Sequence, residues 1–119
     1  MYGLDKDTDL SFFSEKELLQ VCVGEYQIIL KFDGSIQLSL ECTFEHVRKD
    51  GQVFLGDSSN PISSSSLLTL LGSSAKRADN IGEGNIELFF SNGDRIRIYD
   101  SNDGTESYNI TFPEGRIVV

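Results

Sequence analysis

The residues best suited to acid–base chemistry are a single histidine and its neighbours. His46 is the only histidine of the chain, and Cys42 and Glu45 stand close to it in sequence. Nucleophilic catalysis needs a base that a third group holds in place, and the sequence marks no such group beside His46. It also contains no Gly-x-Ser-x-Gly nucleophile motif. We therefore expect His46 to be a half-buried residue at a strand end, with no catalytic residues, and the protein not to be an enzyme.

Carboxylates gather in the segment 100–111, which reads "DSNDGTESYNIT". An EF-hand calcium loop needs glycine at its sixth position and an acidic residue at its twelfth, and both places hold threonine here. The stretch 102–104 is better explained as a turn. What remains is a weak cation site of another kind at Asp100, Asp103 and Glu106. Neither a metal centre nor a cofactor is expected, because the two cysteines lack metal-ligand spacing and no phosphate-binding motif is present.

A third group of residues is suited to binding rather than catalysis. Arg95, Arg97 and Tyr99 alternate along one predicted strand, and Glu87 and Phe89 lie on the strand before it. Arginine and aromatic side chains are favoured at the centres of protein interfaces, so these five residues are a candidate protein-binding strip. The other interpretation is a solvated ladder of cross-strand pairs, or a face covered by a helix.

The elements that carry these residues are strands, because apolar and polar residues alternate with a period of two. The parity of the apolar residues predicts a three-residue loop 91–93, which pairs Leu88 with Ile96 and sets Glu87 across from Arg97. The loop 33–35 likewise pairs Leu30 with Leu38. The strand after it is expected to run on through Cys42 to residue 44.

The two hairpins are similar enough to suggest an internal duplication. Setting Gly24 against Gly82 brings Ile28 onto Ile86 and Leu30 onto Leu88, and the order of the elements agrees. The two copies would span approximately 10–46 and 68–110. Further strands are expected at 52–55 and at "SYNITF" and "RIVV". Short helical segments are expected at 10–13 and from a Ser64 or Ser65 cap through residue 71. The predicted fold is a mainly β, minor α+β, single domain 1–119 whose antiparallel sheets come from two similar β-meander halves, each with a short helix.

Composition and charge limit the partners. The chain has 19 Asp and Glu against 10 Lys and Arg, a net charge of −9, and 39% hydrophobic residues. Such a field repels phosphate backbones and anionic lipids, so neither nucleic acid nor a membrane is expected, whereas a basic protein would be attracted. The first residues have neither a signal peptide's pattern nor a membrane span, so we expect a cytosolic protein.

The chain also resembles a known family. The succession "ELLQVCVGEYQIILKFD", "LLTLLG", "IELFFSNGDRIRIYD", "ESYNI" and "RIVV" is similar to an uncharacterised bacterial family of small single-domain β-rich proteins. The resemblance covers nearly the whole chain, and it implies a fold and a bacterial origin without supplying a mechanism. In size and charge alone, the chain is also similar to immunity proteins that block toxins. The favoured hypothesis is a non-enzymatic protein-interaction domain, sharpened to an inhibitor of a basic toxin, and the alternative is a small-ligand or cation-binding domain.

Overall fold

The structure is a computed structural model that describes residues 4–101 and 106–119. Within them it contains ten strands and two short 3-10 helices. In chain order these elements are η1 (Ser11–Phe13), β1 (Lys16–Val23), β2 (Ile28–Phe32), β3 (Ile36–Leu40), β4 (Thr43–Val47), β5 (Val53–Asp57), η2 (Pro61–Leu70), β6 (Ser74–Gly82), β7 (Asn85–Phe90), β8 (Arg95–Ile98), β9 (Tyr108–Phe112) and β10 (Gly115–Val118). The mainly β class predicted from alternation is confirmed.

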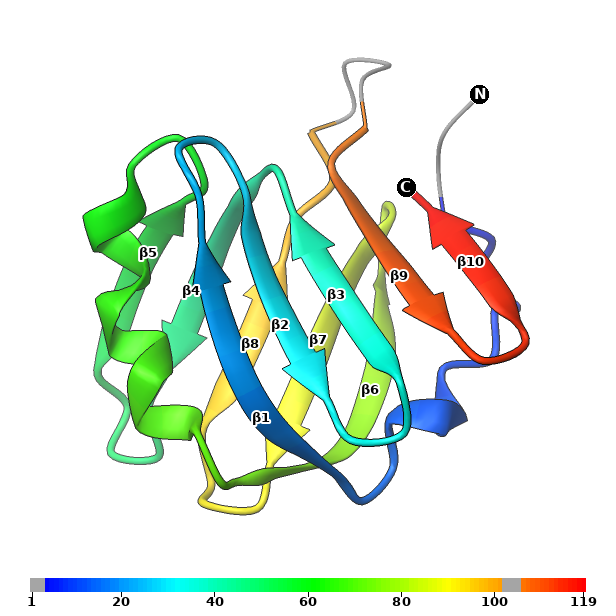
Figure 1. The fold of residues 1–119 in the computed structure, drawn as a ribbon, viewed down its shortest axis with the longest axis horizontal. Coiled ribbons are helices and arrows are strands. Elements are labelled where there is room, and N and C mark those ends of the chain that lie inside the picture. Colours follow the sequence, from blue (N-terminus) through cyan, green and yellow to red (C-terminus); the bar gives the residue numbers. More distant parts are fainter. Residues whose placement is uncertain (1–3, 102–105) are drawn as a thin grey trace.

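The strands form one antiparallel sheet that folds over on itself into two layers (Figure 1). The strand order is β10-β9-β3-β2-β1-β6-β7-β8-β4-β5. The first five strands of this order make one layer and the last five make the other (Figure 1). A short ladder joins the layers, pairing Lys16 with Ala75 and Glu17 with Ser74. Because β10 and β5 are the two edges of the sheet, the strands do not close into a barrel.

Each half of the chain passes two strands to the opposite layer. β1, β2 and β3 are neighbours, but β4 pairs with β8 in the other layer and carries β5 with it. In the same way β6, β7 and β8 are neighbours, whereas β9 pairs with β3 and carries β10. The strands β1 to β5 correspond in turn to β6 to β10. If each strand is replaced by its counterpart, the same strand order results, read from the opposite edge of the sheet. A duplication would produce this arrangement, but the predicted copies 10–46 and 68–110 do not reach β5 and β10, and the common origin of the two halves stays a prediction.

Both hairpin registers agree with the parity argument. Leu30 lies opposite Leu38 in the first hairpin, and Leu88 lies opposite Ile96 in the second. Gly93 closes the second loop with φ +93°, a left-handed backbone conformation that glycine adopts without a steric penalty. The registers turn the aliphatic side chains of both hairpins toward the space between the layers.

Those side chains form the core. Ile28, Leu30, Ile86 and Leu88 are fully buried, and burial of each such side chain contributes about 1.5–3 kcal/mol. Phe32 and Phe90, which occupy equivalent places in the two hairpins, stack with their ring centroids 6.3 Å apart. The layers are therefore held together by matching residues of the two halves.

One strand boundary was predicted wrongly. The strand expected to continue through Cys42 to Phe44 ends at Leu40, and β4 begins at Thr43 and crosses to the other layer. Cys42 and Phe44 are nevertheless buried, as their phase predicted. The inward alternation continues across the break, so the pattern of apolar residues does not reveal that the chain changes layer.

The helical segments lie close to where they were expected. η2 covers the open side between β5 and β1 (Figure 1), and its Leu67 and Leu70 side chains are fully buried. It begins at Pro61 rather than at a serine cap, because the fixed φ of proline suits the first position of a helix. Gly72 follows its end with φ +88°. The turn expected at 10–13 is η1.

A close approach in the second layer can be tested by substitution. A Cβ added to Gly56 would lie 2.1 Å from Cζ of Phe44, whose ring is buried in the core. We expect Gly56→Ala to lower the free energy of unfolding by about 1–3 kcal/mol, measured by urea denaturation. Gly115→Ala is the matched control, because the nearest atom there is 3.9 Å away. Equal losses in both variants would show that the Phe44 contact is not the cause.

Candidate functional site

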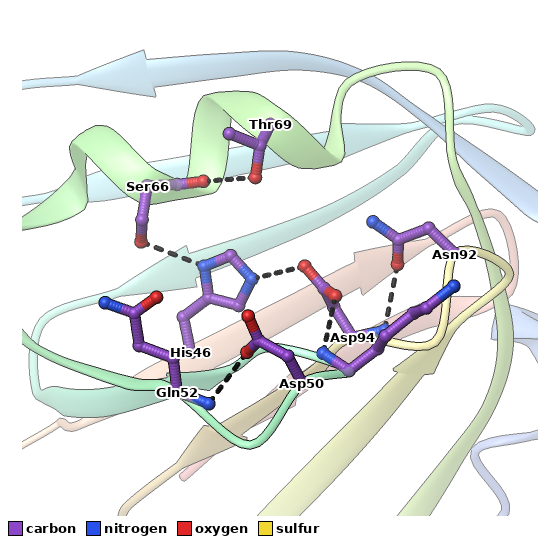
Figure 2. Close-up of polar contacts among 8 residues, drawn as sticks. His46, Asp50, Gln52, Ser66, Thr69, Asn92 and Asp94 are labelled. Atoms are coloured by element: carbon purple, nitrogen blue, oxygen red, sulfur yellow. Dashed lines mark hydrogen bonds and ion pairs between the residues drawn. The ribbon is translucent and has the colours of Figure 1, made fainter.

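The single histidine is the centre of a buried polar chain (Figure 2). His46 points inward from β4 and is fully buried, so the prediction of a half-buried residue is wrong. Its Nε2 lies 2.8 Å from Oδ2 of Asp94, at the end of the β7–β8 loop. Its Nδ1 lies 2.9 Å from Oγ of Ser66 on η2. Three elements far apart in the sequence therefore meet at one imidazole.

The partners considered from the sequence are not the partners in the structure. Glu45 lies on the opposite face of β4, where it contacts Tyr99 and Arg97. Cys42 is buried, and this burial raises the pKa of its thiol to about 12. A thiol with that pKa stays protonated at neutral pH and is not a nucleophile.

The hydrogen bonds around Asp94 define where the protons lie. Burial alone would raise the pKa of Asp94, but hydrogen bonds from His46 and from the Lys49 backbone N–H outweigh burial, so the pKa lies below its ordinary value. Since an ionised carboxylate only accepts hydrogen bonds, Nε2 of His46 carries a hydrogen. When the imidazole is neutral, Nδ1 is then the acceptor for the Ser66 hydroxyl.

A serine, a histidine and an aspartate in this order can activate the serine hydroxyl as a nucleophile. In this structure the Ser66 hydroxyl is engaged by the buried imidazole. Ser66 directs Oγ from η2 down into the protein, toward an imidazole with no exposed surface (Figure 2). The chain of hydrogen bonds instead ties η2 to β4 and to the β7–β8 loop.

The equivalent place in the other layer is apolar. Across the second loop, the Phe90 backbone N–H donates to the Asp94 carbonyl oxygen. Across the first loop, Phe32 pairs with Ile36, so Ile36 is the counterpart of Asp94. His46 pairs with Ile96 of β8, and its topological counterpart Ile110 pairs with Leu38 of β3. The other layer therefore has Ile110 at the place of His46 and Ile36 at the place of Asp94. The fold accepts an apolar pair at this place.

The five residues predicted as a protein-binding strip are brought together on the outer face of the second layer. Arg97 donates from Nε to Oε2 of Glu87 at 2.6 Å, and Nη1 of Arg95 lies 3.6 Å from the same oxygen. The Tyr99 hydroxyl donates to Glu45. The pKa of Arg97 is raised, chiefly by its hydrogen bond to Glu87, and burial raises the pKa of Tyr99.

The charges of this outer face balance one another. The Arg77 guanidinium lies 4.2 Å from the centroid of the Phe89 ring and also pairs with Asp79. Three arginines, Arg77, Arg95 and Arg97, thus face three carboxylates, Asp79, Glu87 and Glu45. Next to them the edge strand β5 exposes 47% of Val53 and 73% of Leu55. The face is a neutral ladder with an apolar border, and it does not carry the negative charge of the chain.

The negative charge gathers instead at one end of the two layers. The turns after β1, β3, β5, β6 and β8 all lie at this end (Figure 1). They carry the carboxylates of Glu25, Glu41, Asp57, Glu83, Asp100 and Glu106, and none of these turns contains a lysine or an arginine. Arg116 of β10 reaches Glu106, with 3.8 Å between Nη2 and Oε1. We call these six carboxylates the acidic end.

The predicted cation site lies partly outside the described residues, because Asp103 is not among them. Asp100 accepts from the Ser107 hydroxyl at 2.8 Å, and Glu106 accepts from the Asn109 amide at 2.6 Å. Among residues 4–101 and 106–119, no three His, Cys, Asp or Glu side chains are grouped so that they could hold a metal ion. Cation binding at this loop stays a prediction.

Sequence reasoning missed the chain of Ser66, His46 and Asp94. One signal was present, because parity placed both His46 and Asp94 on inward faces, where an unpaired polar residue is costly. The pairing of β4 with β8 that joins them was not predicted. Ser66 was one of four consecutive serines, 63–66, that the pattern did not distinguish.

Comparison with known proteins gives one match. Residues 13–119 match a family described as a family of unknown function, DUF6188. Comparison with the curated proteins gives no match, and neither does comparison with the solved structures. In the described part of the chain, no helix is long and apolar enough to cross a membrane.

The buried pair can be tested against its apolar counterpart. Asp94→Ile alone leaves the Nε2–H of buried His46 without its acceptor, and we expect a loss of about 1–3 kcal/mol in the free energy of unfolding. Replacing both residues, His46→Ile with Asp94→Ile, reproduces the other layer and should recover most of that loss. Urea denaturation of the wild type, both single variants and the double variant measures the coupling. Losses that simply add would contradict a paired role.

The pH dependence of stability follows from the lowered pKa of Asp94. In the unfolded chain the carboxyl titrates near its ordinary value of 3.8, and in the folded protein it titrates lower. Its contribution to stability is therefore complete above the unfolded value and is lost as the pH falls through the folded pKa. The difference in unfolding free energy between the wild type and Asp94→Asn should be largest near neutral pH and shrink in acid. A difference that does not change with pH would refute this assignment.

Proposed function

Because the chain belongs to the DUF6188 family of unknown function, its role has to be inferred from its surface, and we propose that it is a non-enzymatic protein-interaction domain for a basic partner. The observation that carries the proposal is the acidic end. Its six carboxylates stand on turns without a lysine or an arginine, whereas the remaining surface mixes both signs. A positively charged protein would be steered toward that end first.

The neutral ladder on the outer face of the second layer would form a second part of the same binding interface. It adjoins the acidic end, because Tyr99 directly precedes Asp100. Its arginine and aromatic side chains are held in place by Glu87 and Glu45 before any partner arrives. Side chains that are already ordered lose less entropy on binding. The exposed Leu55 beside them offers apolar area that a partner can bury.

The sharpest form of the proposal is an immunity-type inhibitor of a basic bacterial toxin in the cytoplasm. Acidic side chains would cover a positively charged active site and exclude its substrate, and the long-range field would speed the encounter. An enzymatic role has less support, because the one Ser-His-Asp arrangement directs its hydroxyl into the protein. The alternative role, a small-ligand or cation-binding domain, would use Asp100 and Glu106 at the same end.

The experiment removes charge from the acidic end without removing packing. Glu25, Glu41 and Glu83 are exposed, so the variant Glu25→Gln, Glu41→Gln, Glu83→Gln should fold normally. Basic proteins captured by the immobilised wild-type chain from a bacterial lysate serve as partners, and surface plasmon resonance measures their association rates. We expect association to slow by about tenfold at low ionic strength, and the difference to vanish at high salt.

The matched control is Asp7→Asn, Asp33→Asn, Asp50→Asn, which has the same net charge but leaves the acidic end intact. It should associate at close to the wild-type rate. Equal slowing in the two triple variants would assign the effect to net charge alone and remove the proposed site. Retention of no basic protein would reject the proposal, and stabilisation by added calcium would favour the alternative role.

A further inference from the structure

A groove in the first layer lies away from the acidic end and from the buried histidine. Its volume is about 530 Å³, and it opens between the segment before η1 and the β9–β10 hairpin. Phe12, Phe112 and Ile117 form its apolar part, and Asp9 and Glu114 stand at its rim. Such a volume lies within the range of ordinary ligand sites, which is roughly 300–1,000 Å³.

The symmetry of the strand order allows the surroundings of this groove to be compared with the side that η2 covers. In the other half of the protein η2 packs between β5 and β1 and buries Leu67 and Leu70. By the correspondence of β5 with β10 and of β1 with β6, the equivalent place on the opposite side of the molecule lies between β10 and β6. η1 has only three residues and packs against β6, and among residues 4–101 and 106–119 no helix of the length of η2 covers β10. Leu10 and Phe13 are the buried apolar side chains of the η1 segment, and the groove is lined instead by Phe12 together with residues of β9, β10 and the turn between them.

The side chains of the groove select the chemistry of an occupant. The rings of Phe12 and Phe112 stack with centroids 4.4 Å apart and an interplanar angle of 10°, and both remain partly exposed. They offer flat apolar area beside Ile117 of β10. An occupant therefore needs at least one apolar side chain to displace water from these rings.

The rim adds a requirement for positive charge. The Ser11 backbone N–H donates to Oδ1 of Asp9 at 2.9 Å, and this hydrogen bond lowers the pKa of Asp9, so its carboxylate is ionised at neutral pH. Glu114 faces the same groove, and no lysine or arginine is among the residues that line it. An apolar group next to a cation complements both parts of the groove.

We infer that this groove binds a short segment of another polypeptide in which an apolar side chain stands next to a lysine or an arginine. A peptide is favoured over a small molecule because β10, which carries Ile117 of the groove, is an edge strand whose outer side pairs with no other strand of the described sheet. The position of β10 at the sheet edge leaves the groove open to a chain approaching from the side. The inference rests on the proposed protein-interaction role and adds a second contact point at a distance from the acidic end.

The test uses a synthetic hexapeptide of alternating lysine and leucine as the probe, with the glutamate-leucine peptide as its matched control. Amide chemical shifts of the full chain are followed by NMR during titration. We expect saturable shifts at Asp9, Phe12, Phe112 and Ile117 with the lysine peptide and none with the glutamate peptide. Asp9→Asn with Glu114→Gln should weaken binding by about five- to tenfold, because two exposed ion pairs are lost.

Three controls keep the result decisive. Asp33→Asn with Asp50→Asn removes the same charge elsewhere and should bind the peptide as the wild type does. Phe112→Ala should abolish the saturable shifts, and a thermal unfolding curve shows whether that variant is folded. Benzylamine, a cation with one flat ring, should bind more weakly than the peptide.

Several outcomes would overturn the inference. These are shifts confined to the acidic end, unchanged binding by Asp9→Asn with Glu114→Gln, or benzylamine binding as tightly as the peptide, which would make the groove a small-molecule site. The Glu25→Gln, Glu41→Gln, Glu83→Gln variant separates the two proposals. Loss of partner association in that variant, with peptide binding retained, would support the groove as a separate site.

Discussion

The exchange of strands between the two layers is the constraint on which the rest of the structure depends. Each half of the chain completes the sheet of the other, because β4 pairs with β8 and β9 pairs with β3. The layers themselves meet in a ladder of two residue pairs. Stability therefore comes from the aliphatic interior and the crossed strands, and neither half has a complete layer of its own. Contacts between residues far apart in sequence dominate such a fold, and folds of this kind form slowly.

The same exchange creates the buried polar chain. His46 approaches Asp94 only because β4 leaves its own half, and Ser66 is positioned by η2 on the open side of the layers. A buried ion pair is weak support for stability, since apolar residues of similar size often do as well. The isoleucines at the corresponding place show that this fold can use them. The polar chain links η2 to both β4 and the β7–β8 loop, because Ser66 of η2 satisfies Nδ1 of the imidazole and Asp94 satisfies Nε2.

Local pattern predicted much of the fold, and non-local pairing accounts for most of what was missed. The period of two along a strand places Leu30, Leu38, Leu88 and Ile96 inward, and the loop lengths then determine both hairpin registers. The same period continues through Cys42, so alternation cannot report where the chain changes layer. The five residues of the candidate strip could be expected to lie together because they are neighbours within one hairpin, whereas their role in binding stays a prediction. The groove and the acidic end arise from tertiary placement, which no spacing in the sequence encodes.

The symmetric strand order has a consequence for shorter chains. A polypeptide of half this length with one set of these elements could not pair its fourth strand within its own layer. Two such polypeptides could form the same ten-stranded order by trading their last two strands about a twofold axis. The single chain has the strand exchange of an intertwined dimer, and because the segment with η2 joins the two sets of strands, their association does not depend on concentration.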